Sequence, residues 1–93
     1  MYPREAQRAS QDVFRRANER LLAAIEDRID ESRPIPFLCE CLDSRCRSTV
    51  RLSIEQFRDL QLSDNRYAIV TGHPFDGERI LDEDGGVAIV ETA

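Results

Sequence analysis

The three cysteines of this 93-residue chain all lie in one short stretch, "FLCECLDSRC" at 37–46. The single histidine, His73, follows much later in the chain. A cluster of thiols this dense is typical of a metal site, a redox centre or a small sulfur-containing core. In each of these alternatives, the three cysteine side chains of residues 37–46 lie close together. The cysteine cluster therefore constrains the fold more than any other feature of the sequence.

The spacing of the cysteines favours a metal site. Cys39 and Cys41 are separated by one residue, so on a regular strand both face the same side. The turn-forming segment 42–45 can fold Cys46 back toward them. His73 lies at the end of a predicted strand, in a Gly-His-Pro turn that can aim its ring inward. Three cysteines and one histidine make a closed tetrahedral structural Zn²⁺ site, so we predict these four residues as zinc ligands.

Charge supports a divalent ion at this site, although other occupants stay open. Three thiolates and one Zn²⁺ leave a net charge of about −1, which the flanking Arg45 and Arg47 would offset. An iron–sulfur cluster can also take cysteine and histidine ligands. Free or redox-active thiols, or buried cysteines acting as small apolar residues, are the remaining interpretations. A disulfide between Cys39 and Cys41 would close a very tight, strained ring.

A long amphipathic helix is predicted over residues 4–33. Apolar residues recur there at intervals of three and four, which is typical of one helix face: Phe14, Ala17, Leu21, Ile25 and Ile29. Pro34 and Pro36 end the pattern. A helix of that length exceeds the expected width of the remaining chain, so part of its apolar stripe can project beyond it.

The charge along this helix predicts a partner for the stripe. Residues 1–20 hold five Arg and three Asp or Glu, whereas residues 21–34 hold two Arg and four Asp or Glu. An antiparallel mate would align each basic half with an acidic half, with Phe14, Leu21 and Ile25 forming the seam. The mate would be a second copy or another protein. The alternative is that the stripe covers the chain's own sheet.

For residues 35–93 we predict a small α+β domain with a zinc-ribbon-like knuckle. This domain and the helical segment 1–34 are expected to form one structural unit. The expected elements are strands at 36–40 and 48–52, a short helix at 53–62, a turn at 63–65, a strand at 66–71 and a hairpin at 78–92. Ser53 and Gln56 form a capping box at the start of the short helix. Gly85 and Gly86 mark the hairpin turn. The fold class is therefore a long N-terminal helix followed by a small antiparallel sheet.

Charge and hydropathy exclude several classes of function. The formal net charge is −5, and residues 62–93 account for it with two Arg and seven Asp or Glu. An acidic surface repels a phosphate backbone, so a nucleic-acid partner is not expected. No apolar run approaches the length of a membrane span. Residues 1–20 show no secretory pattern, and three cysteines do not make a disulfide framework, so we expect a cytoplasmic protein.

Several strings together resemble a known family. They are "PFLCECLDSRC", "VRLSIEQFRDL", "GH", "GERIL" and "GGVAIVE", within about residues 11–92. The chain resembles a family of small, largely uncharacterised bacterial proteins, common in actinobacteria, with a Phe-x-Cys-Glu-Cys-x4-Cys motif followed by Gly-His. The resemblance implies that the four predicted ligands are matched metal ligands, and it implies no activity. Leu42, Phe57 and Thr71 depart from the family pattern, but none of them is a ligand.

Nothing in the sequence predicts an enzyme. Four protein ligands leave a zinc ion no open position for a substrate, and a ligating histidine is not free to act as a base. The sequence therefore favours a zinc-stabilised protein-interaction or regulatory module. One alternative is a nucleic-acid-binding zinc ribbon that uses Arg45, Arg47 and Arg51. The other is a thiol-based redox or metal sensor.

Overall fold

The structure is a computed structural model that describes the backbone of residues 4–92 and the side chains of 11–77 and 79–92. Residues 1–3 and 93, the outer ends of the two predicted segments, lie outside the described residues. The predicted α+β class is confirmed. The elements are α1 (Arg4–Ile25), β1 (Ile35–Leu38), β2 (Thr49–Leu52), α2 (Ile54–Gln61), β3 (Arg66–Val70), β4 (Gly77–Asp84) and β5 (Val87–Thr92).

The long helix is present but shorter than predicted. It ends at Ile25, and the predicted segment 26–33 forms turns instead. No basic residue lies in the last helical turn to balance the helix dipole. Beyond it, Asp30 accepts hydrogen bonds from the N–H and the hydroxyl of Ser32, at 2.9 and 2.8 Å. Such local side-chain bonds compete with helical backbone bonds, which explains why the apolar pattern predicted too long a helix.

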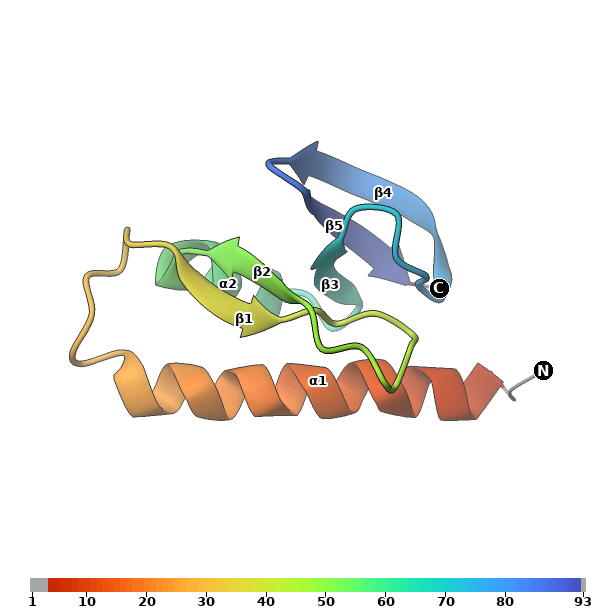
Figure 1. Cartoon of the computed structure of the whole chain (residues 1–93), viewed down its shortest axis with the longest axis horizontal. Coiled ribbons are helices and arrows are strands. Elements are labelled where there is room, and N and C mark those ends of the chain that lie inside the picture. Colours follow the sequence, from red (N-terminus) through yellow and green to blue (C-terminus); the bar gives the residue numbers. More distant parts are fainter. Residues whose placement is uncertain (1–3, 93) are drawn as a thin grey trace.

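The strands form two antiparallel sheets, where the sequence predicted one. β1 pairs with β2, and the other three strands follow the order β3-β5-β4. Figure 1 shows α1 running along the β1–β2 hairpin, with the three-stranded sheet beyond it. The segment after β1 joins the two sheets, because the N–H of Glu40 donates to the carbonyl of Ala68 at 2.9 Å.

The core lies between α1, α2 and both sheets. Phe37 of β1 stacks on Phe57 of α2, with ring centroids 4.5 Å apart and planes 10° apart. The predicted capping box is confirmed: Ser53 accepts from the N–H of Gln56, and the Gln56 side chain accepts from the N–H of Ser53. The β4–β5 turn also forms as predicted, at two glycines with φ of 58° and 83°.

The buried side of α1 differs from the predicted stripe. Phe14 and Leu22 are buried, but so are the amides Gln11 and Asn18. Leu21 and Ile25 are half-buried and pack against the core of their own chain. The residues predicted as a dimer seam therefore already contact or approach intramolecular neighbours. Association through this helix stays a prediction. Within residues 4–92, neither helix combines the length and apolar character that a membrane span needs.

Candidate metal centre

The four predicted residues come together from two parts of the chain. Cys39 and Cys41 follow β1, Cys46 ends the next turn, and His73 follows β3. Their ligand atoms all lie within 4.8 Å of one another. Cys39 and Cys41 are buried, whereas Cys46 and His73 are half-buried. This group could hold a metal ion near the surface of the junction between the two sheets.

The cysteine turn is built by the local sequence. Asp43 accepts from the N–H of Arg45 through its side chain and from the N–H of Cys46 through its carbonyl, at 2.9 and 3.0 Å. Asp favours such turns because its side chain caps the backbone two residues on. The N–H of Cys39 donates to the carbonyl of Ser48 at 3.0 Å, which extends the β1–β2 ladder past the strands. The turn therefore returns Cys46 toward the start of its own loop.

The histidine turn depends on a glycine. The N–H of His73 donates to the carbonyl of Val70 at 3.0 Å, and Gly72 between them has φ 89°. That backbone conformation favours glycine, and it lets the chain reverse directly after β3. Thr71 occupies a position where the turn accepts many residues, so it does not disrupt the reversal. A bond from the N–H of Leu42 to the carbonyl of Pro74, 2.9 Å, ties this turn to the cysteine loop.

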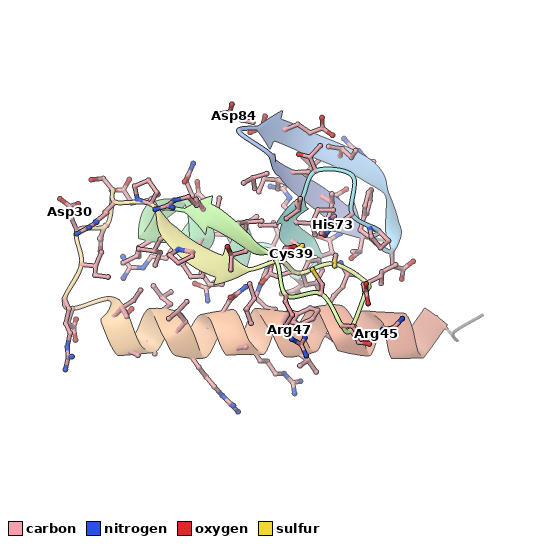
Figure 2. The ribbon with its side chains drawn as sticks, viewed as in Figure 1. Asp30, Cys39, Arg45, Arg47, His73 and Asp84 are labelled. Carbon is pink, nitrogen blue, oxygen red and sulfur yellow. The ribbon has the colours of Figure 1, made fainter. Side chains whose placement is uncertain are left out.

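Two distances between the ligand atoms match those of a tetrahedral metal site. His73 Nδ1 lies 3.5 Å from Cys39 Sγ and 3.7 Å from Cys46 Sγ. In a tetrahedral zinc site, ordinary metal–sulfur and metal–nitrogen bonds put sulfur and nitrogen about 3.6 Å apart. Nδ1 is thus the histidine nitrogen that faces the thiols. Figure 2 shows His73 beyond Cys39, while Arg45 and Arg47 lie along the same loop beside α1.

Burial disfavours the ionised form of two of the three thiols. Burial raises the pKa of Cys39 to about 12; the N–H of Val70, 3.2 Å from the sulfur, lowers it, and the neighbouring thiols raise it. Burial also raises the pKa of Cys41. Burial acts to raise the pKa of Cys46, but hydrogen bonds from Ser48 and from the other thiols lower it overall. Three thiolates at this spacing repel one another unless a cation lies between them.

The sequence interpretation missed the residue between the two buried cysteines. Glu40 is 0% exposed. Its Oε2 accepts from Arg15 Nε at 2.7 Å and Asn18 Nδ2 at 3.1 Å, and its Oε1 accepts from Arg15 Nη2 and the N–H of Ala68, both at 3.0 Å. Gln11 donates to its carbonyl at 2.9 Å. The strand alternation that places two thiols on one side also places Glu40 on the other, facing α1.

The arginine bound to Glu40 is itself enclosed. The Arg15 guanidinium lies 4.8 Å from the Tyr67 ring centroid and 5.4 Å from that of Phe57, and it also donates to the carbonyl of Arg66. Its side chain is 12% exposed. A buried charge pair of this kind needs further hydrogen bonds to offset the loss of water, and the bond to the carbonyl of Arg66 supplies one.

Comparisons with protein-family models, with curated proteins and with solved structures found no match to this chain. The case for a metal centre therefore rests on the geometry of the four residues and on the chemistry of their donor atoms.

Proposed function

We propose that the chain is a zinc-stabilised protein-interaction module of the cytoplasm, with Cys39, Cys41, Cys46 and His73 as the zinc ligands. The observation that supports this most is the convergence of three sulfurs and one ring nitrogen within 4.8 Å. Zinc suits a tetrahedral set of thiolate and imidazole ligands. The role of the ion is structural, because four protein ligands leave no position for a substrate or a reactive water.

The position of the site supports a structural role. Three ligands lie in the loop that connects β1 to β2 of the first sheet, and the fourth follows β3 of the second. A metal bond at this junction would hold the two sheets against each other. Small domains gain much of their stability from such bonds, since their cores are small.

Metal content and ligand substitutions test the proposal together. Native mass spectrometry and elemental analysis should find one zinc per chain. His73→Ala should release zinc to a chromophoric chelator faster than the wild type, whereas His73→Cys, which restores a zinc-binding side chain, should retain it. Replacing zinc by Co²⁺ should give the visible absorption of a tetrahedral sulfur-rich site. No metal, or iron at one or two per chain, would overturn the assignment.

A further inference from the structure

The two outer edges of the β1–β2 hairpin differ in their hydrogen bonding. On the outer edge of β1, the N–H and the carbonyl of Leu38 both bond to the Asn18 side chain, at 2.7 and 2.9 Å. The N–H of Cys39 donates to the carbonyl of Ser48, so the backbone groups of Ser48 point toward β1. Backbone groups alternate in direction along a strand, so those of Thr49 and Arg51 point away from β1. Among the described residues, those outward groups of β2 have no partner.

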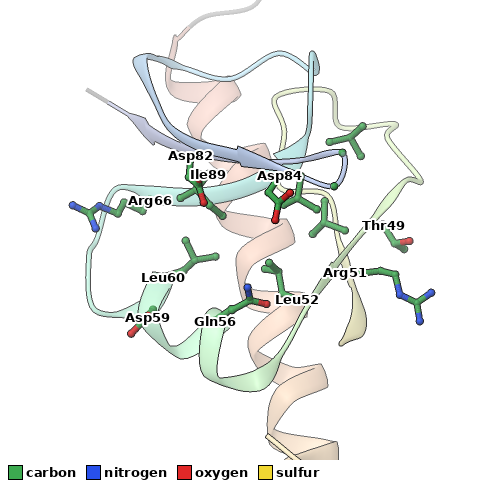
Figure 3. A pocket seen from close by; sticks show the side chains of 15 residues that line it. Thr49, Arg51, Leu52, Gln56, Asp59, Leu60, Arg66, Asp82, Asp84 and Ile89 are labelled. Atoms are coloured by element: carbon green, nitrogen blue, oxygen red, sulfur yellow. The ribbon is translucent and has the colours of Figure 1, made fainter. Parts of the chain in front are cut away.

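This open edge borders a groove of about 630 Å³. The groove lies between β2, α2 and the outer face of the three-stranded sheet. Each of these elements contributes to its apolar lining: Val50, Leu52, Leu60, Val70, Val87 and Ile89. Figure 3 shows Leu52 and Leu60 on one side of the groove, opposite the β4–β5 hairpin. An apolar groove beside an unpaired strand is the arrangement that binds extended peptides by strand addition.

The charge around the groove selects the partner. Asp82 and Asp84 reach toward the groove from β4, and Asp59 lies on the α2 side (Figure 3). None of these three carboxylates forms an ion pair within the described part of the chain. Arg66, which also lines the groove, is already beside Glu91, with Nε and Oε2 3.6 Å apart. Arg51 also lines the groove, but its side chain extends away from Asp82 and Asp84 (Figure 3). The unpaired charge facing a ligand is therefore negative.

We propose that this groove binds an extended, basic segment of a partner protein as an added strand on the free edge of β2. Its backbone would pair with the outward groups of Thr49 and Arg51. Alternate side chains would point into the groove, where arginine or lysine stems cover the apolar lining and their charged ends reach Asp82 and Asp84. The inference specifies the partner surface of the proposed interaction module and rests on that function.

The test uses zinc-loaded full-length protein and a fluorescent seven-residue peptide in which arginine alternates with threonine. We expect saturable binding by anisotropy, with amide resonances of Thr49 and Arg51 shifting and becoming protected from hydrogen exchange. A peptide with glutamate in place of arginine should not bind. No binding of the arginine peptide at about 1 mM, or binding that leaves the β2 amides unchanged, would overturn the proposal.

Two pairs of variants separate charge from backbone contributions. Asp82→Asn with Asp84→Asn should weaken binding about fivefold to tenfold, whereas Asp27→Asn with Asp64→Asn, the same change at exposed acids outside the groove, should leave it unchanged. Arg51→Pro removes an outward N–H and should abolish binding, while Arg51→Gln keeps that N–H and should bind. Equal affinity across either pair would contradict strand addition by a basic segment.

Arg51→Pro should not break the β1–β2 ladder. Arg51 lies opposite Pro36, which has no N–H, so these two positions exchange no ladder hydrogen bond. The zinc content and circular dichroism of the variant show whether it is folded, and the charge variants give an independent result if it is not. A dimer that protects the Arg51 amide without peptide would overturn the proposal in favour of pairing between copies. The zinc content of each sample is measured before the peptide is added. A zinc-loaded protein that does not bind the peptide contradicts only this inference. A folded protein without zinc contradicts the proposed function.

Discussion

The segment from Cys39 to Cys41 has two sides that are stabilised in opposite ways. Toward the second sheet it presents two buried thiols, which belong to the group that could hold a metal ion. Toward α1 it presents Glu40, whose charge is balanced by Arg15 and whose oxygens each accept two hydrogen bonds. Alternation by one residue thus separates a candidate metal site from a polar site whose charges and hydrogen bonds are all supplied by the chain.

The difference shows what each side contributes to the fold. The carboxylate side attaches α1 to the edge of β1, through contacts to three residues of one helix face. The thiol side joins the β1–β2 hairpin to the turn after β3. If the two sides act separately, a substitution on one side should leave the contacts of the other side intact, and both can be measured in the same protein.

Removing the metal should have the largest effect. Structural zinc contributes binding free energy on the order of 10 kcal/mol to folding, comparable with the whole stability of a small domain. We expect chelation at neutral pH to abolish cooperative melting and most of the β-sheet signal in circular dichroism, and zinc addition to restore both. Unchanged melting of a zinc-free sample would show that the thiol side is not needed for folding.

Replacing the buried carboxylate should have the next largest effect. Glu40→Gln removes the charge that balances Arg15 and places amide hydrogens against existing donors, which should lower the free energy of unfolding by about 3–5 kcal/mol. Denaturant titration of zinc-loaded protein measures the change, and zinc content should stay at the wild-type level in the folded protein. Glu83→Gln, the same chemical change at an exposed position of β4, serves as the control. Equal stability of the two variants would contradict a role for the Glu40 cluster.

Asn18→Ala weakens the attachment of α1 to β1, and it also removes one of the four hydrogen bonds that the Glu40 carboxylate accepts. The substitution leaves the N–H and the carbonyl of Leu38 without their side-chain partner, at a cost of about 2 kcal/mol. Hydrogen exchange should show faster opening at Leu38, while Cys39, whose N–H bonds to Ser48, stays protected. Arg20→Ala, at an exposed position on the same helix, should change neither amide. Equal acceleration at both amides would mean that the two sides open together.

Tyr67→Phe should have the smallest effect and a distinctive pH dependence. The Tyr67 hydroxyl donates to Asp12 at 2.9 Å, a bond worth about 1 kcal/mol at neutral pH. Burial, followed by the Asp12 hydrogen bond, raises the pKa of Tyr67 to about 12 from its ordinary value near 10.

The sign of this shift fixes the expected trend. Because the folded state favours the neutral phenol, the contribution is complete below pH 10 and is lost as pH rises through about 12. The stability advantage of the wild type over Tyr67→Phe should therefore shrink across that interval in parallel denaturant titrations. A constant difference from pH 8 to pH 12 would contradict the raised pKa.

The sequence predicted those parts of the molecule that local patterns determine. The strands, α2 with its Ser53 cap, the glycine turn and the convergence of the four predicted ligands follow from alternation, turn chemistry and residue type. The end of α1 was wrong because Asp30 and Ser32 form their own turn. A buried Glu40 was not predicted, because its burial depends on polar side chains of a helix that lies more than 20 residues earlier. The spacing of Gln11, Arg15 and Asn18 was the available signal.

The chain separation between the ligands has a consequence for the order of folding. Cys39, Cys41 and Cys46 are neighbours in the chain, but His73 lies 27 residues beyond Cys46, with α2 and β3 between them. Closing a loop of that length costs about 3 kcal/mol of chain entropy. On the proposed function, the cysteines can capture an ion early, and the nitrogen–metal bond forms only once β3 has found its place. The last ligand to bind would then also be the first to leave when the second sheet opens.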